Sequence, residues 1–148
     1  MIIFICGMLF AGLNLLTPFV NVTVKGVPPG KKFSLAKNGY PKLRVYNKGK
    51  EKVIVRVNVV SRGQKVESRI IVEREVFEIE PGSFSETDLI IFVPKRKENY
   101  GKRFEREILI TGRTEKGNVQ GGLRSKIVFY TTKKKSFFQW LKELLKGR

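Results

Sequence analysis

The side chains that could act as nucleophiles include the serines Ser34, Ser61, Ser68, Ser83, Ser85 and Ser125. Nucleophilic catalysis by serine needs a neighbouring base that removes the hydroxyl proton. The chain has no histidine, which excludes Ser-His-Asp and Cys-His catalysis and any histidine-liganded metal. A serine–lysine pair remains compatible with the sequence, but lysine is so frequent that such a pairing carries no information.

The carboxylates show no isolated pair of the kind that acid–base catalysis uses. Asp88 is the only aspartate, and most glutamates alternate with basic residues, as in Glu73-Arg74-Glu75 and Glu105-Arg106-Glu107. This alternation is typical of a solvated strand face with cross-strand ion pairs. The sequence contains no phosphate loop, dinucleotide fingerprint or EF-hand loop, and its one cysteine excludes an intrachain disulfide and a cysteine zinc site. We therefore expect a protein that is not an enzyme and needs no metal or cofactor.

The C-terminal segment 133–148 has the clearest pattern for binding. Ser136 can cap a helix, and the apolar residues after it recur at helical spacing. One helical face then collects Phe137, Trp140, Leu141, Leu144 and Leu145, with Phe138 on its flank. The basic residues around this face are Lys133, Lys134, Lys135, Lys142 and Lys146. We expect a basic amphipathic helix that inserts into the interface of an anionic membrane or contacts a partner; the alternative is packing on its own domain or on another copy.

The N-terminal residues 1–16 contain no charged side chain and lead into Thr17-Pro18. Their length fits the apolar core of a signal peptide, so we expect a leader at 1–17, export from the cytoplasm and a domain over 18–132. No Lys or Arg precedes the run, and no clear cleavage site precedes Thr17, so an uncleaved anchor is the alternative. A buried helix or strand and lipidation at Cys6 are further alternatives, although Ile5 is not the small residue that lipidation favours.

The charge of the chain is strongly positive. It has 30 Lys and Arg against 13 Asp and Glu, a net charge of +17 over 148 residues. The run Lys95-Arg96-Lys97 lies in an expected turn, where its charges project toward anionic surfaces such as lipid head groups, nucleic acids or acidic glycans. The sequence shows no recognition helix and no RNA-binding aromatic signature. A thermophile-like surface of ion-pair networks would not explain the excess of one sign.

The elements that must position these residues are strands. A hydrophobic content of 41% is enough for one core. Besides a short piece at 33–35, apolar alternation separated by turn residues predicts strands at 19–24, 43–46, 53–60, 70–72, 76–79, 89–93, 104–110 and 123–130. Because no helical crossover lies between them, the sheets must be mainly antiparallel. We expect an all-β, immunoglobulin-like sandwich of seven or eight strands, with an OB-type barrel as the alternative.

Three local features carry their own expectations. The segment Asn47-Lys48-Gly49-Lys50 predicts a tight hairpin turn between its flanking strands. In the strand 104–110, Phe104, Ile108 and Ile110 share a face that would also turn Arg106 inward, so we expect a bulge or a late strand start. Residues 114–122 contain glycines and are expected to form a loop.

Several of these motifs together resemble a known group of domains. The hairpin over 43–49 before a valine strand, the Pro-Gly-Ser turn within 77–85, and Val93-Pro94 followed by 100–104 are similar to landmarks of extracytoplasmic immunoglobulin-like domains. PapD-like pilus-chaperone domains and accessory sandwich domains of bacterial and archaeal surface proteins have such layouts. The resemblance covers about residues 20–131 and implies a binding or structural role without a catalytic residue. A full pilus chaperone has a second domain, for which this chain is too short.

The sequence as a whole predicts a non-catalytic protein-interaction or structural module in the periplasm or at the cell surface. Its partners are expected to be another protein, engaged for example by strand addition at an open edge, and an anionic membrane surface. The alternative function is binding of a polyanion, either nucleic acid or acidic glycan, by the basic surface of the domain.

Overall fold

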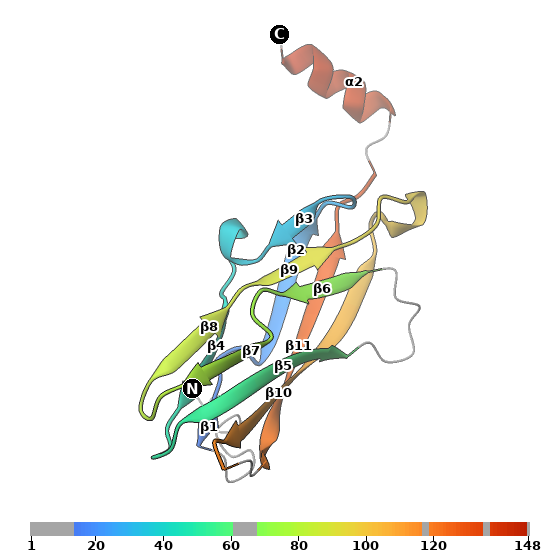
Figure 1. Ribbon diagram of the computed structural model, residues 1–148. Helices are drawn as coiled ribbons and strands as arrows, with labels where there is room; N and C mark the ends of the chain where they lie inside the picture. Colours follow the sequence, from blue (N-terminus) through green and yellow to red (C-terminus); the bar gives the residue numbers. More distant parts are fainter. Residues whose placement is uncertain (1–13, 61–67, 117–118, 135–136, 148) are drawn as a thin grey trace.

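The computed structural model describes residues 14–60, 68–116, 119–134 and 137–147. Within these ranges the chain forms eleven strands, two short 3₁₀ helices and one α-helix near the C-terminus (Figure 1). The all-β immunoglobulin-like sandwich with a C-terminal helix is therefore confirmed. The strand count exceeds the expected seven or eight because the short piece near 33–35 forms a strand of its own and because two strands, Leu15–Leu16 and Phe84–Thr87, are not among those that the sequence predicts.

One layer of the sandwich is a five-stranded sheet with the order β2-β11-β10-β5-β7. Its strands are β2 (Asn21–Val27), β5 (Val53–Val60), β7 (Val76–Ile79), β10 (Arg103–Thr114) and β11 (Val119–Thr131). All neighbours pair antiparallel except β2, which runs parallel to β11. The expected valine alternation in β5 is confirmed, because Val53, Val55 and Val57 are buried and Arg56 is exposed.

The other layer consists of two three-stranded sheets, ordered β1-β4-β8 and β3-β9-β6. Their strands are β1 (Leu15–Leu16), β3 (Lys32–Ser34), β4 (Leu43–Asn47), β6 (Arg69–Val72), β8 (Phe84–Thr87) and β9 (Leu89–Phe92). β9 has a neighbour on both sides, as its apolar sequence predicts. Buried Leu, Ile, Val and Phe side chains from the strands form a single core.

Asp88 lies where this layer divides into its two three-stranded sheets. It separates β8 from β9, and the chain between their partners β4 and β3 leaves the layer through η1 (Ala36–Asn38). The buried carboxylate accepts hydrogen bonds from the backbone N–H of Ala36 (3.1 Å) and of Leu89 (2.9 Å), and from the hydroxyl of Ser34. The only aspartate of the chain thus fixes the interruption that sequence periodicity does not reveal.

We expect Asp88→Ala to lower the free energy of unfolding by roughly 2 kcal/mol, because it leaves buried donors without an acceptor. Asp88→Asn is the matched control, since its amide oxygen can still accept from Ala36 and Leu89. Urea denaturation of both variants measures the difference. Equal stability of the wild-type chain and Asp88→Ala would contradict this role.

The prediction of a hairpin turn at Asn47–Lys50 is wrong. The flanking strands β4 and β5 belong to different sheets, so this turn carries the chain from one layer to the other. The buried side-chain amide of Asn47 donates to the carbonyls of Glu51 (2.7 Å) and Ile79 (3.0 Å). Its oxygen accepts from the N–H of Gly49 at 2.9 Å. These contacts fix a crossing between layers rather than a two-stranded turn.

The expectations for the last two strands also need correction. β10 runs without a break from Arg103 to Thr114, and Arg106 points inward with 2% of its surface exposed. The irregularity in its pairing with β11 falls between Thr111 and Arg113 instead. The loop expected at 114–122 is shorter, since β10 ends at Thr114 and β11 begins at Val119. The first expected strand begins two residues late, at Asn21.

Residues that the sequence places in a leader also contribute to the fold. Leu15 of β1 pairs with Asn47 of β4 and is 1% exposed, and the Thr17 hydroxyl donates to the carbonyl of Arg44 at 2.7 Å. The expected signal peptide or anchor stays a prediction, and residues 1–13 lie outside the described residues. A cut at Thr17 would remove β1 from the sandwich.

Candidate functional site

The helix α2 (Phe137–Lys146) forms where the apolar spacing predicts it. It projects away from one end of the sandwich, at the top of Figure 1. Trp140, Leu144 and Leu145 are 50%, 51% and 64% exposed, so the helix does not bury this stripe on its own domain. Phe137 and Phe138 lie in its first turn, Leu141 is half-buried, and Lys142 and Lys146 are exposed. No helix in the described part of the chain is long and apolar enough to cross a membrane.

Four chain segments meet at the end of the sandwich from which α2 departs. The N–H of Gly30 donates to the carbonyl of Val93 at 2.7 Å, which joins the turn after β2 to the end of β9. The N–H of Thr132 donates to the carbonyl of Val27 (3.0 Å), and the N–H of Gly101 donates to Thr132 (2.9 Å). Segments that are up to a hundred residues apart in sequence are thereby held side by side.

These segments carry a cluster of positive charge that we call the basic end. It consists of Lys31, Lys32, Lys95, Arg96, Lys97, Lys102, Lys133 and Lys134, all exposed. The stretches 30–32, 95–102 and 131–134 contain one acidic residue, Glu98. The structure thus brings together Lys95–Lys97 and the first two lysines of the tail, while Lys135 lies outside the described residues. Sequence analysis missed Lys31, Lys32 and Lys102, although a lysine pair after Pro28-Pro29-Gly30 was a usable signal.

Charges on the five-stranded sheet are arranged differently, because they are paired. Lys52 lies 2.8 Å from Glu78, which raises the pKa of the lysine, and also contacts Glu80 and Glu115. Lys126 lies 2.5 Å from Glu105 and lowers the pKa of that carboxyl. The lysines of the basic end make no ion pair with any described residue. Ion-pair networks therefore account for the charges of the sheet face and not for the lysines of the basic end.

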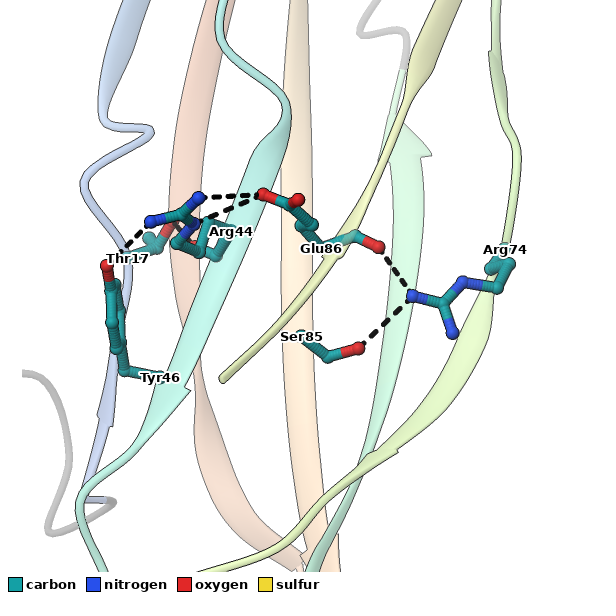
Figure 2. Close-up of polar contacts among 6 residues, drawn as sticks. All are labelled: Thr17, Arg44, Tyr46, Arg74, Ser85 and Glu86. Carbon is teal, nitrogen blue, oxygen red and sulfur yellow. Dashed lines mark hydrogen bonds and ion pairs between the residues drawn. The ribbon is translucent and has the colours of Figure 1, made fainter. Parts of the chain in front are cut away.

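A second candidate surface is the outer face of β4 and β8, at the lower left of Figure 1 and in detail in Figure 2. Nε and Nη2 of Arg44 each lie 3.1 Å from Oε2 of Glu86, and Nη1 donates to the Tyr46 hydroxyl at 3.2 Å. These two acceptors raise the pKa of the guanidinium. The same guanidinium lies 4.5 Å from the ring centre of Phe84, which is 48% exposed.

Arg74 closes the outer edge of β8 beside this face. Its Nη2 donates to the carbonyl of Glu86 (2.5 Å) and the hydroxyl of Ser85 (3.1 Å) (Figure 2). Its backbone N–H donates to the hydroxyl of Thr87. An edge whose carbonyl is occupied by a charged side chain is protected against strand addition. Strand addition at β8 is therefore disfavoured. Sequence analysis missed this face; the alternation of Arg44 and Tyr46 with buried Leu43 and Val45 was its only signal.

The described residues include no group of three or more histidines, cysteines or acidic residues that could hold a metal. A cavity of about 500 Å³ lies among Asn14, Asn47, Lys48, Lys50 and Thr114 at the end of the sandwich opposite α2. Its lining also includes Gly49, Glu51 and Val53, so it combines amides, two lysines, a carboxylate and a threonine.

Comparison with known proteins gives a fold. No family model and no curated protein matches the chain by sequence. PapD-like domain 7 of human CEP192 aligns with a TM-score of 0.65 and 11% identity over 84% of this chain and 89% of that domain. The CupB2 chaperone of Pseudomonas aeruginosa aligns with a TM-score of 0.55 and 16% identity, over 86% of this chain and 61% of that one.

A third similar structure is the CsuC–CsuE chaperone–tip adhesion subunit pre-assembly complex of Acinetobacter baumannii, with a TM-score of 0.52 and 16% identity. The alignment covers 80% of this chain and 52% of that one, so the chain spans a little more than half of these bacterial relatives. The fold of this protein is the PapD-like form of the immunoglobulin-like sandwich, as the sequence resemblance implies.

Proposed function

We propose that this protein is a non-catalytic, extracytoplasmic protein-interaction module that α2 tethers to an anionic membrane surface. The observation that carries the tether is the exposed stripe of Trp140, Leu144 and Leu145 on a helix flanked by lysines. An apolar stripe of this kind, with basic residues beside it, is the pattern of helices that lie in the plane of a membrane interface.

The energies favour a membrane over water as the surroundings of α2. Full burial of a large apolar side chain contributes about 1.5–3 kcal/mol, and three such side chains are half exposed or more. Each lysine near an anionic surface adds about 1 kcal/mol. Both contributions are available in one place, since Lys142 and Lys146 belong to the same helix.

The outer face of β4 and β8 is the proposed contact with a protein partner. It presents arginine, tyrosine and phenylalanine together, and these residue types are over-represented where binding energy concentrates in interfaces. It lies far from α2 in Figure 1, so a membrane bound to the helix leaves it accessible. The chaperone–subunit complex with a similar fold supports a protein partner in general. The apolar residues 1–16 support a location outside the cytoplasm.

A second candidate function is the binding of a polyanion, nucleic acid or acidic glycan, by the domain. The observation that favours it is the basic end, whose lysines make no ion pair with described residues. This alternative gives no role to the apolar stripe of α2.

Sedimentation with anionic vesicles tests the tether. We expect Trp140→Gln/Leu144→Gln to bind at least roughly tenfold more weakly than the wild-type chain, since tenfold corresponds to about 1.4 kcal/mol of lost burial. The substitutions leave the net charge unchanged. Phe84→Gln is the matched control, because it removes an equally exposed apolar side chain from the β4–β8 face. Unchanged binding of the α2 variant, at low and high salt, would refute the tether.

A further inference from the structure

We infer that the basic end of the sandwich is itself a second contact with the anionic membrane surface, so that the domain stands on the bilayer with this end down. The inference rests on the proposed function of α2 and adds a partner for the lysines that lie outside it. A domain attached by the helix alone could take many orientations, whereas a second contact made by the sandwich itself restricts them and strengthens the attachment.

The backbone of the basic end is held in place, so its lysines form one defined surface. Gly30 has a φ of 86°, and a side chain there would place its Cβ 2.9 Å from the Cβ of Lys95. The turn after β9 is anchored by buried Asn99, whose amide donates to the carbonyl of Pro94 at 2.9 Å. The Thr131 hydroxyl donates to the carbonyl of Asn99 (2.6 Å), which ties this turn to β11. These backbone contacts therefore hold Lys31 and Lys95 close together.

The position of α2 favours a lipid surface over a nucleic acid or a glycan. Lys133 and Lys134 of the basic end lead directly into the helix whose apolar stripe is exposed. Nucleic acids and acidic glycans offer anions but no apolar phase for Trp140, Leu144 and Leu145. A bilayer interface offers both an apolar phase and anionic head groups, and surface charges act over about 8 Å at physiological salt.

The consequence for function is a fixed display of the protein-binding face. The outer face of β4 and β8 lies toward the opposite end of the sandwich from α2 (Figure 1). With the basic end on the membrane, Arg44 and Phe84 face away from the lipid. A partner is then expected to bind this face without competing with the bilayer.

The test compares two full-length triple variants that remove the same charge from opposite ends. Lys31→Gln/Lys32→Gln/Lys95→Gln changes the basic end, and Lys48→Gln/Lys50→Gln/Lys116→Gln changes exposed lysines at the far end. Binding is measured by sedimentation with vesicles of phosphatidylcholine containing phosphatidylserine, with pure phosphatidylcholine vesicles alongside. We expect the first variant to bind the anionic vesicles at least roughly tenfold more weakly and the second to stay within about twofold of the wild-type chain. Neither variant should change the urea midpoint or the binding to neutral vesicles.

Two results would overturn the inference. Equal weakening of vesicle binding in both variants would mean that the net positive charge of the protein attracts the membrane, without a site at the basic end. No weakening in either variant would mean that α2 binds the membrane alone. The second result leaves the tether standing, whereas unchanged binding of Trp140→Gln/Leu144→Gln refutes the tether itself. The same proteins are titrated with a short DNA duplex: loss of duplex binding in the first variant, with vesicle binding unchanged, would assign the basic end to nucleic acid instead.

Discussion

A chain that begins at Pro18 is expected to unfold at a much lower urea concentration than one that begins at Asn14. The shorter chain lacks β1, and with it the buried side chain of Leu15. Leu15 packs so closely on β10 that a Cβ on Gly112 would come within 2.7 Å of its Cδ1. Loss of a buried leucine leaves a cavity, which costs about 2–5 kcal/mol.

Thr17 adds to the expected loss. Its hydroxyl donates to the carbonyl of Arg44 at 2.7 Å and accepts from the N–H of Phe19 at 3.1 Å. Without Thr17, both backbone groups lose a partner in a buried setting, at about 1 kcal/mol each. We expect a total decrease of roughly 4–7 kcal/mol in the free energy of unfolding, which is a large part of the stability of a domain of this size.

Point variants in the full chain separate packing from truncation. Leu15→Ala should reproduce most of the loss, whereas Leu16→Ala should cost under about 1 kcal/mol, because Leu16 is only half-buried on the outer side of β1. If the chain from Pro18 is as stable as the chain from Asn14, β1 is dispensable and a leader boundary at residue 18 is compatible with the folded domain. If it is less stable, any cleavage site that preserves the fold lies before Leu15.

The sequence predicts the fold class well because it depends on a short-range pattern. Alternation of Val53, Val55 and Val57 with polar residues identifies a strand with one buried face, whatever its neighbours are. The turn at Asn47 shows the limit of such signals. An Asn-x-Gly segment specifies a local backbone conformation, but the partner of each strand is set by distant contacts, here the bond from Asn47 to Ile79.

The same distinction applies to the candidate site. The stripe of α2 is predictable, because a helix of ten residues arranges its own side chains. The basic end is predictable only in part, since Lys31, Lys95, Lys102 and Lys133 meet through bonds between four separate segments. The face of β4 and β8 depends on the pairing of Tyr46 with Phe84, which are far apart in sequence. Periodicity carries no information about such pairs.

Substitution of Arg106 is the second change from which we expect a large loss of stability. The alternation of the strand places this charged residue on the face that packs into the apolar core. The side chain is 2% exposed, and burial lowers the pKa of its guanidinium. Nη2 donates to the hydroxyl (2.6 Å) and the carbonyl (3.2 Å) of Ser68, and Nη1 donates to the carbonyl of Glu105 at 2.8 Å. These bonds allow the strand to remain regular, so no bulge is needed to turn the arginine outward.

We expect Arg106→Ala to lower the free energy of unfolding by roughly 3 kcal/mol, because it leaves a cavity and removes the donors that Ser68 uses. Arg106→Met keeps most of the volume and removes the buried charge, so it should cost less than half as much. Adding Ser68→Ala to Arg106→Met removes the unpaired hydroxyl and should recover part of the remaining loss. Urea denaturation of the wild-type chain, Ser68→Ala, Arg106→Met and the double variant forms a double-mutant cycle, in which the coupling between positions 68 and 106 measures the bond.

The outcome decides how this sandwich accommodates a charge in its core. Strong coupling, with Arg106→Met milder than Arg106→Ala, means that the guanidinium is held by Ser68 and that the position could be apolar. Additive effects would mean that Ser68 is incidental and that contacts such as the Phe104 ring, 6.0 Å from the guanidinium carbon, hold the side chain instead. Phe104 stacks on buried Phe129 of β11. In that case the arginine would stabilise the fold by packing against this pair of aromatic rings.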